Sequence, residues 1–428
     1  MEHLNHKLYN MYELITCLTN AGDLIRPELT KHHLQVAYLA SKIGAQLGLS
    51  KKIKKDLLLA GFLHDVGALS LSERLELIEN EPLTSNNHGY IGAELIKGFQ
   101  PLREVAEIIR YHHVAWDNGK GNMFNGCLVP KLSHIVHLAD RIVVMIDPNQ
   151  EILGQIQNIQ NEILKSKNSI FVPELVEAFL IISNQEYIWL DLVYNSMLNQ
   201  MTRIMISETM ELDLDEVIQL AKIFANIIDF RSAFTANHSA GVAKTAEKLA
   251  ELAGFSENEC KKMLVAGYLH DLGKLAVENS LLEKPSKLDL SEFNVMKSHT
   301  FYTYRLLQSI KEFDEINQWA SFHHERLDGN GYPFHLAAKD ISLGSRIMAV
   351  ADIFTAITED RPYRKGMSHD NTVEVLKTMA ENGAISSYIV SIVIDHFDLI
   401  NEVRHKAQKE ATIVHRRFLK MEEELKLS

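Results

Sequence analysis

One arrangement of histidine and aspartate residues occurs twice in this 428-residue chain, and this repeat constrains the fold more than any other feature. The residues recur in the same order, and the spacing between the copies grows only from 206 to 212 positions, as short insertions would produce. The period is far too long for a solenoid, so each copy is expected to form a domain, here 1–205 and 206–428. The matched pairs are His32 with His238, His64-Asp65 with His270-Asp271, His88 with His299, His112-His113 with His323-His324, and Asp140 with Asp352.

The local sequence pattern is helical in both halves. Apolar residues return at three- and four-residue spacing in segments such as 57–63 and 242–250, whereas strand-like alternation is rare and short. We therefore predict an all-α chain that folds into two tandem helical bundles. Side chains from several helices of a bundle can converge on one point, so this architecture suits a metal site.

Composition and charge exclude several classes of protein. The hydrophobic fraction of 46% and the charged fraction of 23% are typical of globular proteins in water, and no apolar run is long enough to span a membrane. The chain starts without a signal-like segment and its three cysteines lie far apart, so we expect a cytoplasmic protein with reduced thiols. The net charge of −12 argues against a general binder of polymeric nucleic acid.

The C-terminal copy offers more metal-ligand side chains than one ion can use. Neutral imidazoles and carboxylates bind first-row divalent metals, and an aspartate next to a histidine can bridge two ions. A tetrahedral ion takes four ligands, so these candidates from separated segments suit two ions with room for water and substrate. Two such ions, roughly 3.5–4 Å apart, favour phosphoryl chemistry. The candidates are His238, His270, Asp271, His299, His323, His324 and Asp352.

Three motifs connect this ligand set with a known family. Residues 323–333 read HHERLDGNGYP, residues 269–274 read LHDLGK, and residues 350–354 read VADIF. Together they resemble the HD-GYP family, whose members are phosphodiesterases that open cyclic dinucleotides on a cluster of metal ions. The resemblance implies two tandem bundles of the HD superfamily, with a phosphodiesterase in the C-terminal half and a degenerate HD domain in the N-terminal half.

The resemblance also implies roles for particular residues. Asp271 is expected to bridge two ions, and a bridging hydroxide would attack one phosphorus and expel a ribose 3′ oxygen. Lys274 follows Asp271 by about one helical turn, so its ammonium can face the same cavity and contact the phosphate or the leaving oxygen. The Gly-Tyr-Pro loop and a later basic run are expected to contact the substrate. These substrate-binding residues are Gly331, Tyr332, Pro333, Arg361, Arg364 and Lys365.

One position bears on the number of metals. Some members of the family carry a glutamate one turn before the first histidine, where it can ligate a third ion. Phe234 occupies that position here and cannot ligate, so we predict two divalent ions in the C-terminal site. Histidine and carboxylate ligands accept several metals, and we expect Fe, Mn or a similar ion.

The N-terminal copy keeps the metal-type positions and loses the substrate apparatus. Ala68 replaces the lysine, residues 114–121 replace the Gly-Tyr-Pro loop, and residues 148–151 replace the basic run. This half resembles the broader HD superfamily and is expected to bind further metal ions. Its role stays open among a regulatory or dimerising domain, a nucleotidase acting on the linear product, and a ligand sensor. Its candidate ligands are Glu28, His32, His64, Asp65, His88, His112, His113 and Asp140.

We expect the chain to hydrolyse a cyclic dinucleotide, either cyclic di-GMP or 3′3′-cyclic GMP-AMP, to a linear dinucleotide. A non-catalytic receptor for the same ligand is the rival from another class, although it could dispense with ligands that are complete here. An HD-superfamily nucleotide phosphohydrolase is the rival enzyme, and such proteins lack the Gly-Tyr-Pro loop. A second copy of the chain and a signalling protein stay open as partners, and no membrane is expected to take part.

Overall fold

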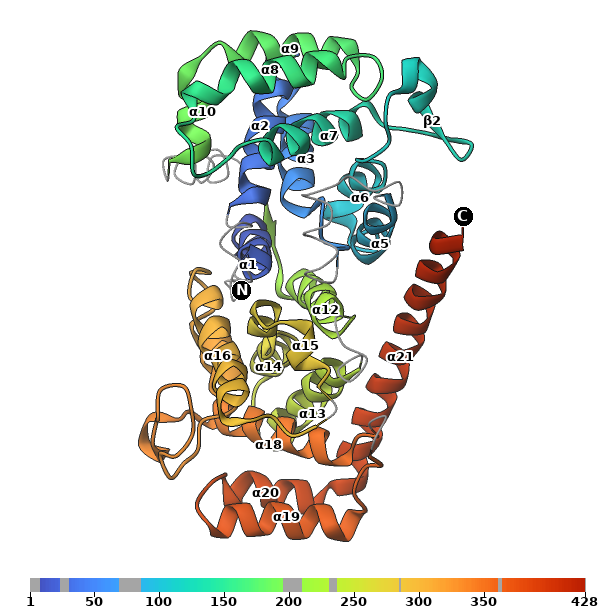
Figure 1. The fold of residues 1–428 in the computed structure, drawn as a ribbon. Coiled ribbons are helices and arrows are strands. Elements are labelled where there is room, and N and C mark those ends of the chain that lie inside the picture. The colour runs from blue at the N-terminus through green and yellow to red at the C-terminus, as the bar shows by residue number, and fades with distance from the viewer. Residues whose placement is uncertain are drawn as a thin grey trace, which may run out of the picture. The chain divides into compact units, whose positions relative to one another are not determined.

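The computed structural model describes residues 8–23, 31–68, 86–194, 210–230, 237–284, 286–360 and 364–427. Helices make up most of this part of the chain (Figure 1), which confirms the predicted all-α class. The strands within it are short, two residues each. β1 (Tyr9–Asn10) pairs antiparallel with β4 (Glu211–Leu212), and β2 (Met123–Phe124) pairs with β3 (Cys127–Leu128). No helix in the described ranges combines the length and the apolar character that crossing a lipid bilayer requires.

The chain divides into two compact units. The C-terminal unit comprises residues 1–25 and 210–420, and the N-terminal unit comprises residues 26–209 and 421–428. The predicted boundary at 205/206 lies outside the described residues and stays a prediction. The helix α1 (Met11–Asp23) belongs to the C-terminal unit. The sequence repeat did not indicate this, because α1 precedes the N-terminal copy.

The packing of α1 explains this membership. Tyr9, just before the helix, is fully buried, and its ring meets Phe313 edge-on with the centroids 5.7 Å apart. The Glu13 carboxylate accepts the backbone N–H of Lys311 at 3.3 Å. The helix also contacts the segments that carry Lys274 and His299. The C-terminal unit therefore includes the start of the chain, and a fragment that begins at residue 206 lacks part of its core.

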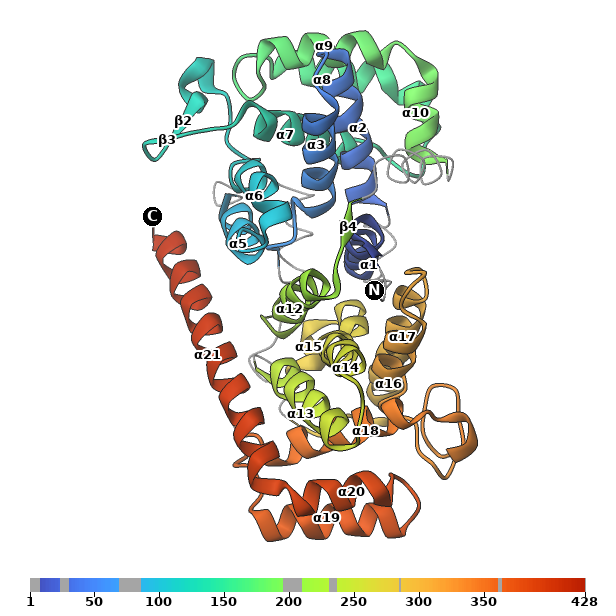
Figure 2. The same cartoon turned by 180° about the vertical axis from the view of Figure 1, so that it is seen from behind.

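The N-terminal unit is a helical bundle with one small hairpin. In this unit β2 and β3 form the hairpin between α6 and α7 (Figure 2). Its helices are α2 (His32–Gln46), α3 (Lys51–Leu63), α5 (Asn86–Ile96), α6 (Arg103–Arg110), α7 (Lys131–Val144), α8 (Ile156–Lys165), α9 (Pro173–Ser183) and α10 (Glu186–Val193), with short 3₁₀ segments η2 (Gln100–Leu102), η3 (Asp117–Asn122) and η4 (Leu153–Gln155).

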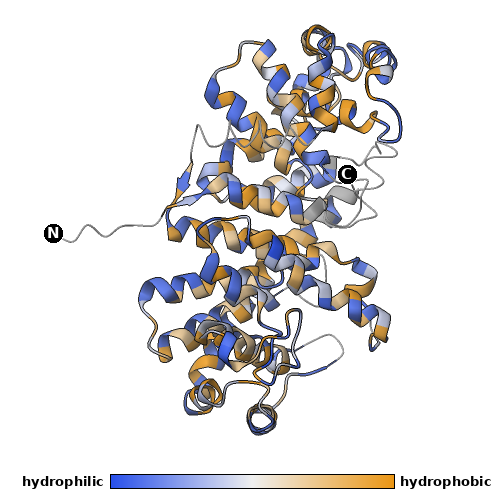
Figure 3. Ribbon diagram, turned by 90° about the vertical axis from the view of Figure 1, so that its left-hand side faces the viewer, coloured by the Kyte–Doolittle hydropathy of each residue, from blue (hydrophilic) through white to orange (hydrophobic). Residues whose placement is uncertain are grey.

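The C-terminal unit repeats the same succession and then extends it. Helices α19 and α20 pack on each other and on α18, and the long α21 follows them. Along the helices, hydrophilic and hydrophobic residues are interspersed, as expected when one face is buried (Figure 3). The elements are α12 (Leu214–Phe230), α13 (His238–Leu252), α14 (Glu257–Leu269), η5 (Leu272–Ala276), α15 (Asn279–Leu282), α16 (Leu290–Leu307), α17 (Asp314–Ser321), η6 (Ala338–Asp340), α18 (Leu343–Thr358), α19 (His369–Glu381), α20 (Ser387–Asp395) and α21 (Phe397–Leu427).

One close helix crossing recurs in both units and positions the His-Asp pairs. Helix α3 crosses α2 at Gly61, where a Cβ atom would lie 2.4 Å from the backbone of Ala37. Helix α14 crosses α13 at Gly267, where a Cβ atom would lie 2.4 Å from the backbone of Ala243. Only glycine permits this approach, and each glycine lies three residues before the histidine of the pair. The crossing therefore places both His-Asp pairs at the same point of their bundles.

Candidate metal centres

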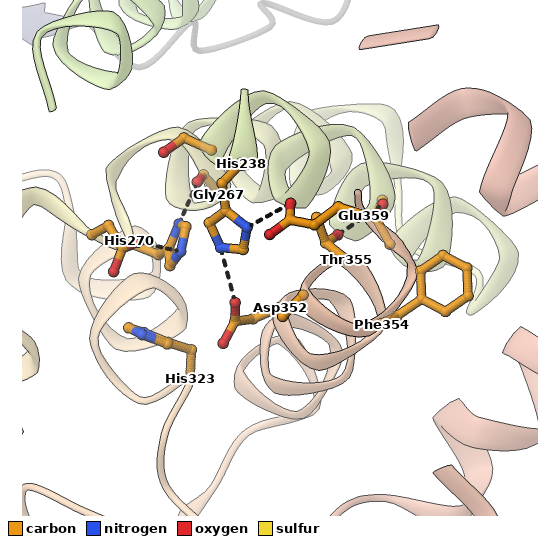
Figure 4. Close-up of polar contacts among 12 residues, drawn as sticks. His238, Gly267, His270, His323, Asp352, Phe354, Thr355 and Glu359 are labelled. Carbon is orange, nitrogen blue, oxygen red and sulfur yellow. Dashed lines mark hydrogen bonds and ion pairs between the residues drawn. The ribbon is translucent and has the colours of Figure 1, made fainter. Parts of the chain in front are cut away.

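The ligand candidates of the C-terminal unit come from separate elements and meet inside the bundle. Four of them, His238, His270, His323 and Asp352, surround one centre in Figure 4. His238 begins α13, His270 and Asp271 follow α14, His299 lies within α16, His323 and His324 follow α17, and Asp352 lies within α18. His324 is partly exposed and the others are buried. The structure thus brings together the residues that the sequence separates by more than a hundred positions.

Hydrogen bonds to the backbone fix the orientation of three imidazoles. The Nδ1 atoms of His270, His299 and His323 lie 2.8, 2.6 and 2.7 Å from the carbonyl oxygen three residues earlier in each case. A carbonyl oxygen only accepts, so each Nδ1 carries the proton and each Nε2 keeps its lone pair. This is the tautomer that a metal-binding histidine needs, with the second nitrogen held by an outer partner.

The free lone pairs point at one another and at carboxylates. The Nε2 atoms of His299 and His323 are 3.4 Å apart, and the Asp271 carboxylate lies 3.4 Å from His299 and 3.2 Å from His270. Burial lowers the pKa of His323 and lowers the pKa of His299 to about 3, so both rings are neutral. Neutral nitrogen acceptors that converge beside a carboxylate suit a divalent cation, so these residues fit the expected metals.

His238 is held by a carboxylate that the sequence analysis did not identify. Its Nε2 lies 3.2 Å from Asp352 and its Nδ1 lies 3.1 Å from Glu359, as the dashed lines of Figure 4 show. Glu359 is buried and also accepts a hydrogen bond from Gln408 at 2.9 Å. Burial lowers the pKa of His238, but the charges of Glu359 and Asp352 outweigh burial and raise it to about 10. A carboxylate behind a ligand histidine is a common outer partner in metal sites. The position of Glu359, seven residues after Asp352, was the sequence signal that could have identified it.

A partly buried lysine neutralises part of the negative charge of the cluster. Lys274 Nζ lies 2.6 Å from the Asp271 carboxylate, as the one-turn spacing predicts. Burial would raise the pKa of Asp271, but His270 and Lys274 hold it well below its usual range. A second buried acid, Asp229, accepts the hydroxyl of Ser239 at 2.8 Å, and burial raises its pKa to about 7. The ammonium of Lys274 is a partly buried cation in direct contact with the cluster.

The Gly-Tyr-Pro loop lies against the cluster. The backbone N–H of Tyr332 donates to the carbonyl of His324 at 3.2 Å, and the two rings are 4.9 Å apart. Buried Glu325 fixes the loop by accepting the backbone N–H groups of Phe334 and Leu336 at 2.7 and 2.9 Å. Only glycine fits at position 331, because a Cβ atom there would lie 2.3 Å from the backbone nitrogen of Arg326. Gly331, Tyr332 and Pro333 thus line the approach to the metal ligands.

The basic run is less well placed. Arg361 lies outside the described residues, as does Phe234, so the expectations that rest on them stay predictions. The Arg364 guanidinium is exposed and donates to the carbonyl of Ala356, and Lys365 is also exposed. Their contact with a substrate remains a prediction.

The N-terminal unit contains a cluster with nearly the same geometry. The Nδ1 atoms of His64 and His112 again lie within hydrogen-bond distance of carbonyl oxygens three residues earlier, at 2.9 and 2.6 Å. The candidate ligands are buried and approach one another as in the other unit. His32 Nε2 lies 3.2 Å from Asp140, His64 Nε2 lies 3.2 Å from Asp65, His88 Nε2 lies 3.1 Å from Asp65, and the Nε2 atoms of His88 and His112 are 3.2 Å apart.

Several features distinguish this second cluster. His33, which the sequence analysis passed over, lies with His64 and Asp65 closely enough for all three to share an ion, and its position beside His32 was the available signal. His113 groups with Asp65, while Glu28 lies outside the described residues. Arg141 donates to one oxygen of the Asp140 carboxylate at 2.8 Å, and the other oxygen faces His32. Both clusters are able to hold metal, and neither the number nor the identity of the ions follows from their geometry alone.

Comparisons with known proteins agree with this arrangement. The HD domain family matches residues 29–145, and a second family described as HD domain matches residues 222–386. The 3′3′-cGAMP-specific phosphodiesterase 1 of Vibrio cholerae is 29% identical over 394 residues, which are 90% of this chain and 91% of the relative. A cyclic di-GMP phosphodiesterase of Pseudomonas aeruginosa is 39% identical over 149 residues, 35% of each chain.

A solved structure shares the fold. The crystal structure of a cyclic GMP-AMP-specific phosphodiesterase of V. cholerae matches with a TM-score of 0.62 and 23% identity, over 92% of this chain and 99% of that one. At that identity the match speaks for the fold alone. Together, the two domain matches, the full-length relatives and the paired clusters show that this chain is a tandem HD-domain protein.

Proposed function

We propose that the C-terminal unit is a metal-dependent phosphodiesterase of the HD-GYP type that opens a cyclic dinucleotide to its linear form. The observation that carries this proposal is the largely buried cluster, in which imidazoles and two aspartates converge beside Lys274 and the Gly-Tyr-Pro loop. The relatives support the substrate class, because their names specify 3′3′-cGAMP or cyclic di-GMP phosphodiesterases.

The residues that would hold the ions form two neighbouring groups. His238, His270 and Asp352 make one group, and His299, His323 and His324 make the other. Asp271 contacts His270 with one carboxylate oxygen and His299 with the other, so it lies between the groups and would be the ligand shared by both ions. Two divalent ions held there would activate a water molecule and neutralise the charge of the phosphate.

The remaining groups of the site orient the substrate. Lys274 is partly buried with its ammonium on Asp271, and from there it can donate to a phosphate oxygen or to the ribose oxygen that leaves. The loop of Gly331, Tyr332 and Pro333 borders the entrance on the side of His324. Arg361, Arg364 and Lys365 would contact the phosphates of the substrate, since guanidinium and ammonium groups pair with phosphate.

The decisive experiment is turnover of a panel of cyclic dinucleotides by the full chain with Mn²⁺ or Fe²⁺. Cyclic di-GMP and 3′3′-cyclic GMP-AMP are expected to yield linear dinucleotides, and Asp271→Ala is expected to abolish this activity. The full chain is required because α1 belongs to the C-terminal unit. Binding of a cyclic dinucleotide without turnover would contradict the proposed enzyme activity and favour the non-catalytic receptor. Turnover of linear nucleotides alone would favour a nucleotide phosphohydrolase.

The N-terminal unit carries a second candidate function. Its buried cluster supports metal binding, and its role is either regulation, which includes dimerisation and ligand sensing, or nucleotidase action on the linear product. The Asp271→Ala variant, whose C-terminal unit is expected to be inactive, can be incubated with Mn²⁺ and a linear dinucleotide or a mononucleotide. Phosphate release that a further Asp65→Ala substitution removes would establish the nucleotidase, and no release would leave regulation.

A further inference from the structure

A cavity of about 520 Å³ opens beside the metal cluster of the C-terminal unit. One wall comes from the first half of α16, with Phe293, Asn294 and Lys297, and the other comes from the loop that holds Asn330 and Tyr332. His324 also lines the cavity, so a ligand that fills it reaches the metal candidates directly. The mechanism proposed above does not use the α16 wall.

Two aromatic rings form a corner inside this cavity. The centroids of Phe293 and Tyr332 are 6.3 Å apart, and the rings stand nearly perpendicular at 83°. Phe293 remains 41% exposed although it is apolar. A flat ligand that stacked on one ring would meet the edge of the other, and base–aromatic stacking of this kind stabilises nucleotide binding.

Lys297 lies beside both aromatic rings and has no acidic partner among the described residues. Lys297 Nζ lies 4.9 Å from the centroid of Phe293 and 6.0 Å from that of Tyr332. Other lysines of this unit pair with carboxylates, such as Lys262 with Glu315 and Lys284 with Glu292. Lys297 has no such ion pair among the residues described, so its ammonium protons are available to an acceptor on a ligand.

We infer that this cavity binds a guanine base of the substrate, with Lys297 as the residue that selects guanine over adenine. The inference rests on the proposed function and deepens it. Guanine presents two adjacent acceptors, O6 and N7, which a lysine can contact together, whereas adenine presents an amino group in place of O6. The aromatic corner stacks either purine, so Phe293 contributes affinity and Lys297 contributes the choice of base. Both cyclic di-GMP and cyclic GMP-AMP offer a guanine.

The test compares bases within each variant. Binding of cyclic di-GMP and cyclic di-AMP is measured by calorimetry on the metal-free full chain, and turnover of both is measured with Mn²⁺. The wild-type chain is expected to prefer cyclic di-GMP, and Lys297→Met is expected to reduce this preference about tenfold. Phe293→Leu is expected to weaken both ligands about tenfold and leave the preference in place. The matched control is Lys377→Met, which removes an exposed lysine on α19.

Each result decides one of the two claims. A folding defect lowers both ligands together and leaves the ratio unchanged, so a changed ratio cannot come from misfolding. An unchanged ratio in Lys297→Met, or a wild-type preference for cyclic di-AMP, overturns the guanine pocket even when turnover is normal. Equal loss for both ligands in Lys297→Met leaves the ratio unchanged and therefore also overturns the base assignment. Binding with the expected ratios but without turnover overturns the proposed enzyme and keeps the pocket.

Discussion

The two clusters of this chain share their ligand geometry and differ in what surrounds it. In each unit a histidine at the start of one helix approaches an aspartate at 3.2 Å, and two Nε2 atoms lie 3.2–3.4 Å apart. Among the described residues, the C-terminal cluster alone has a lysine on the central aspartate, and Ala68 stands at the equivalent position of the other unit. The comparison predicts that holding a metal and performing phosphodiester chemistry are separable tasks in this fold.

The outer partners differ in the same direction. Buried Glu359 holds His238 in the C-terminal unit, whereas the residue at the matching distance after Asp140 is Asp147, which is only partly buried and accepts hydrogen bonds from its own loop. In the N-terminal cluster Arg141 binds one oxygen of Asp140, while the other oxygen faces His32. The C-terminal cluster thus has a cation on its central aspartate and a buried carboxylate behind His238, whereas the cation of the N-terminal cluster lies on Asp140.

The largest expected effect comes from removing the central aspartate of each unit in turn. Asp271→Ala is expected to lower kcat/KM for the cyclic dinucleotide by more than about 10³-fold, because the ligand that joins both metal groups is lost. The matched Asp65→Ala is expected to change the same rate by less than about threefold. Steady-state kinetics with Mn²⁺ measure both. A loss of similar size in Asp65→Ala would mean that the N-terminal cluster takes part in this reaction or controls it.

A smaller effect separates metal holding from chemistry inside one cluster. Lys274→Met keeps the length of the side chain and removes its charge, which gives the C-terminal cluster the character of the N-terminal one. We expect kcat to fall about 10²-fold, the usual cost of losing one preorganised electrostatic contact, while the bound metal content is unchanged. Kinetics and elemental analysis are measured on the same preparation. Lys262→Met, which removes a lysine paired with Glu315, is the control. Equal metal loss would show that the lysine only supports the ligands.

The difference between Glu359 and Asp147 predicts a third effect, smaller than the first two. Glu359→Gln preserves a hydrogen-bond acceptor for His238 and removes the charge, so the imidazole becomes a weaker ligand. We expect the Mn²⁺ concentration for half-maximal activity to rise about tenfold. Asp147→Asn, the counterpart in the other unit, is expected to leave Mn²⁺ binding to the N-terminal cluster unchanged. Electron paramagnetic resonance titration reports free Mn²⁺ for both variants, and equal shifts would abolish the distinction.

Much of this architecture follows from the order of residues, because its signals are periodic. Apolar spacing predicts the helices, and the repeated His-Asp pattern predicts two bundles whose candidate ligands converge. The seven C-terminal candidates all lie around one buried centre. Gly61 and Gly267 show why the pattern is informative, since each close crossing forces the next histidine to the same place.

Other features depend on contacts that a single sequence does not encode visibly. Helix α1 precedes the N-terminal repeat but packs on the C-terminal unit, and only its tertiary partners, such as Phe313, reveal this. Glu359 and His33 lacked a motif of their own, because an outer partner or an added ligand is recognised by direction rather than by spacing. The aromatic corner of Phe293 and Tyr332 likewise joins segments that are distant in sequence.

The smallest expected difference concerns the helices that carry the two His-Asp pairs. Helix α14 begins with a complete capping box, in which Ser256 and Glu259 exchange hydrogen bonds, whereas Ser50 of α3 only accepts one long bond from Ile53 at 3.4 Å. Ser256→Ala is expected to lower the free energy of local unfolding of α14 by about 1 kcal/mol, and Ser50→Ala to lower that of α3 by about 0.5 kcal/mol. Hydrogen exchange with mass spectrometry of the two helices measures both values.

The pH dependence of this difference identifies its source. Hydrogen bonds from Ser256 hold the pKa of Glu259 below its ordinary value of 4.5. A carboxyl whose pKa is lower in the folded state stabilises that state above its unfolded pKa, and the contribution is lost as the pH falls through the folded value. The advantage of the α14 cap is therefore expected to be full at pH 7 and to shrink below about pH 4.5, while the α3 cap, which has no acidic partner, stays constant. If both caps respond alike to acid, the capping box does not account for the greater stability of the helix that carries the proposed catalytic pair.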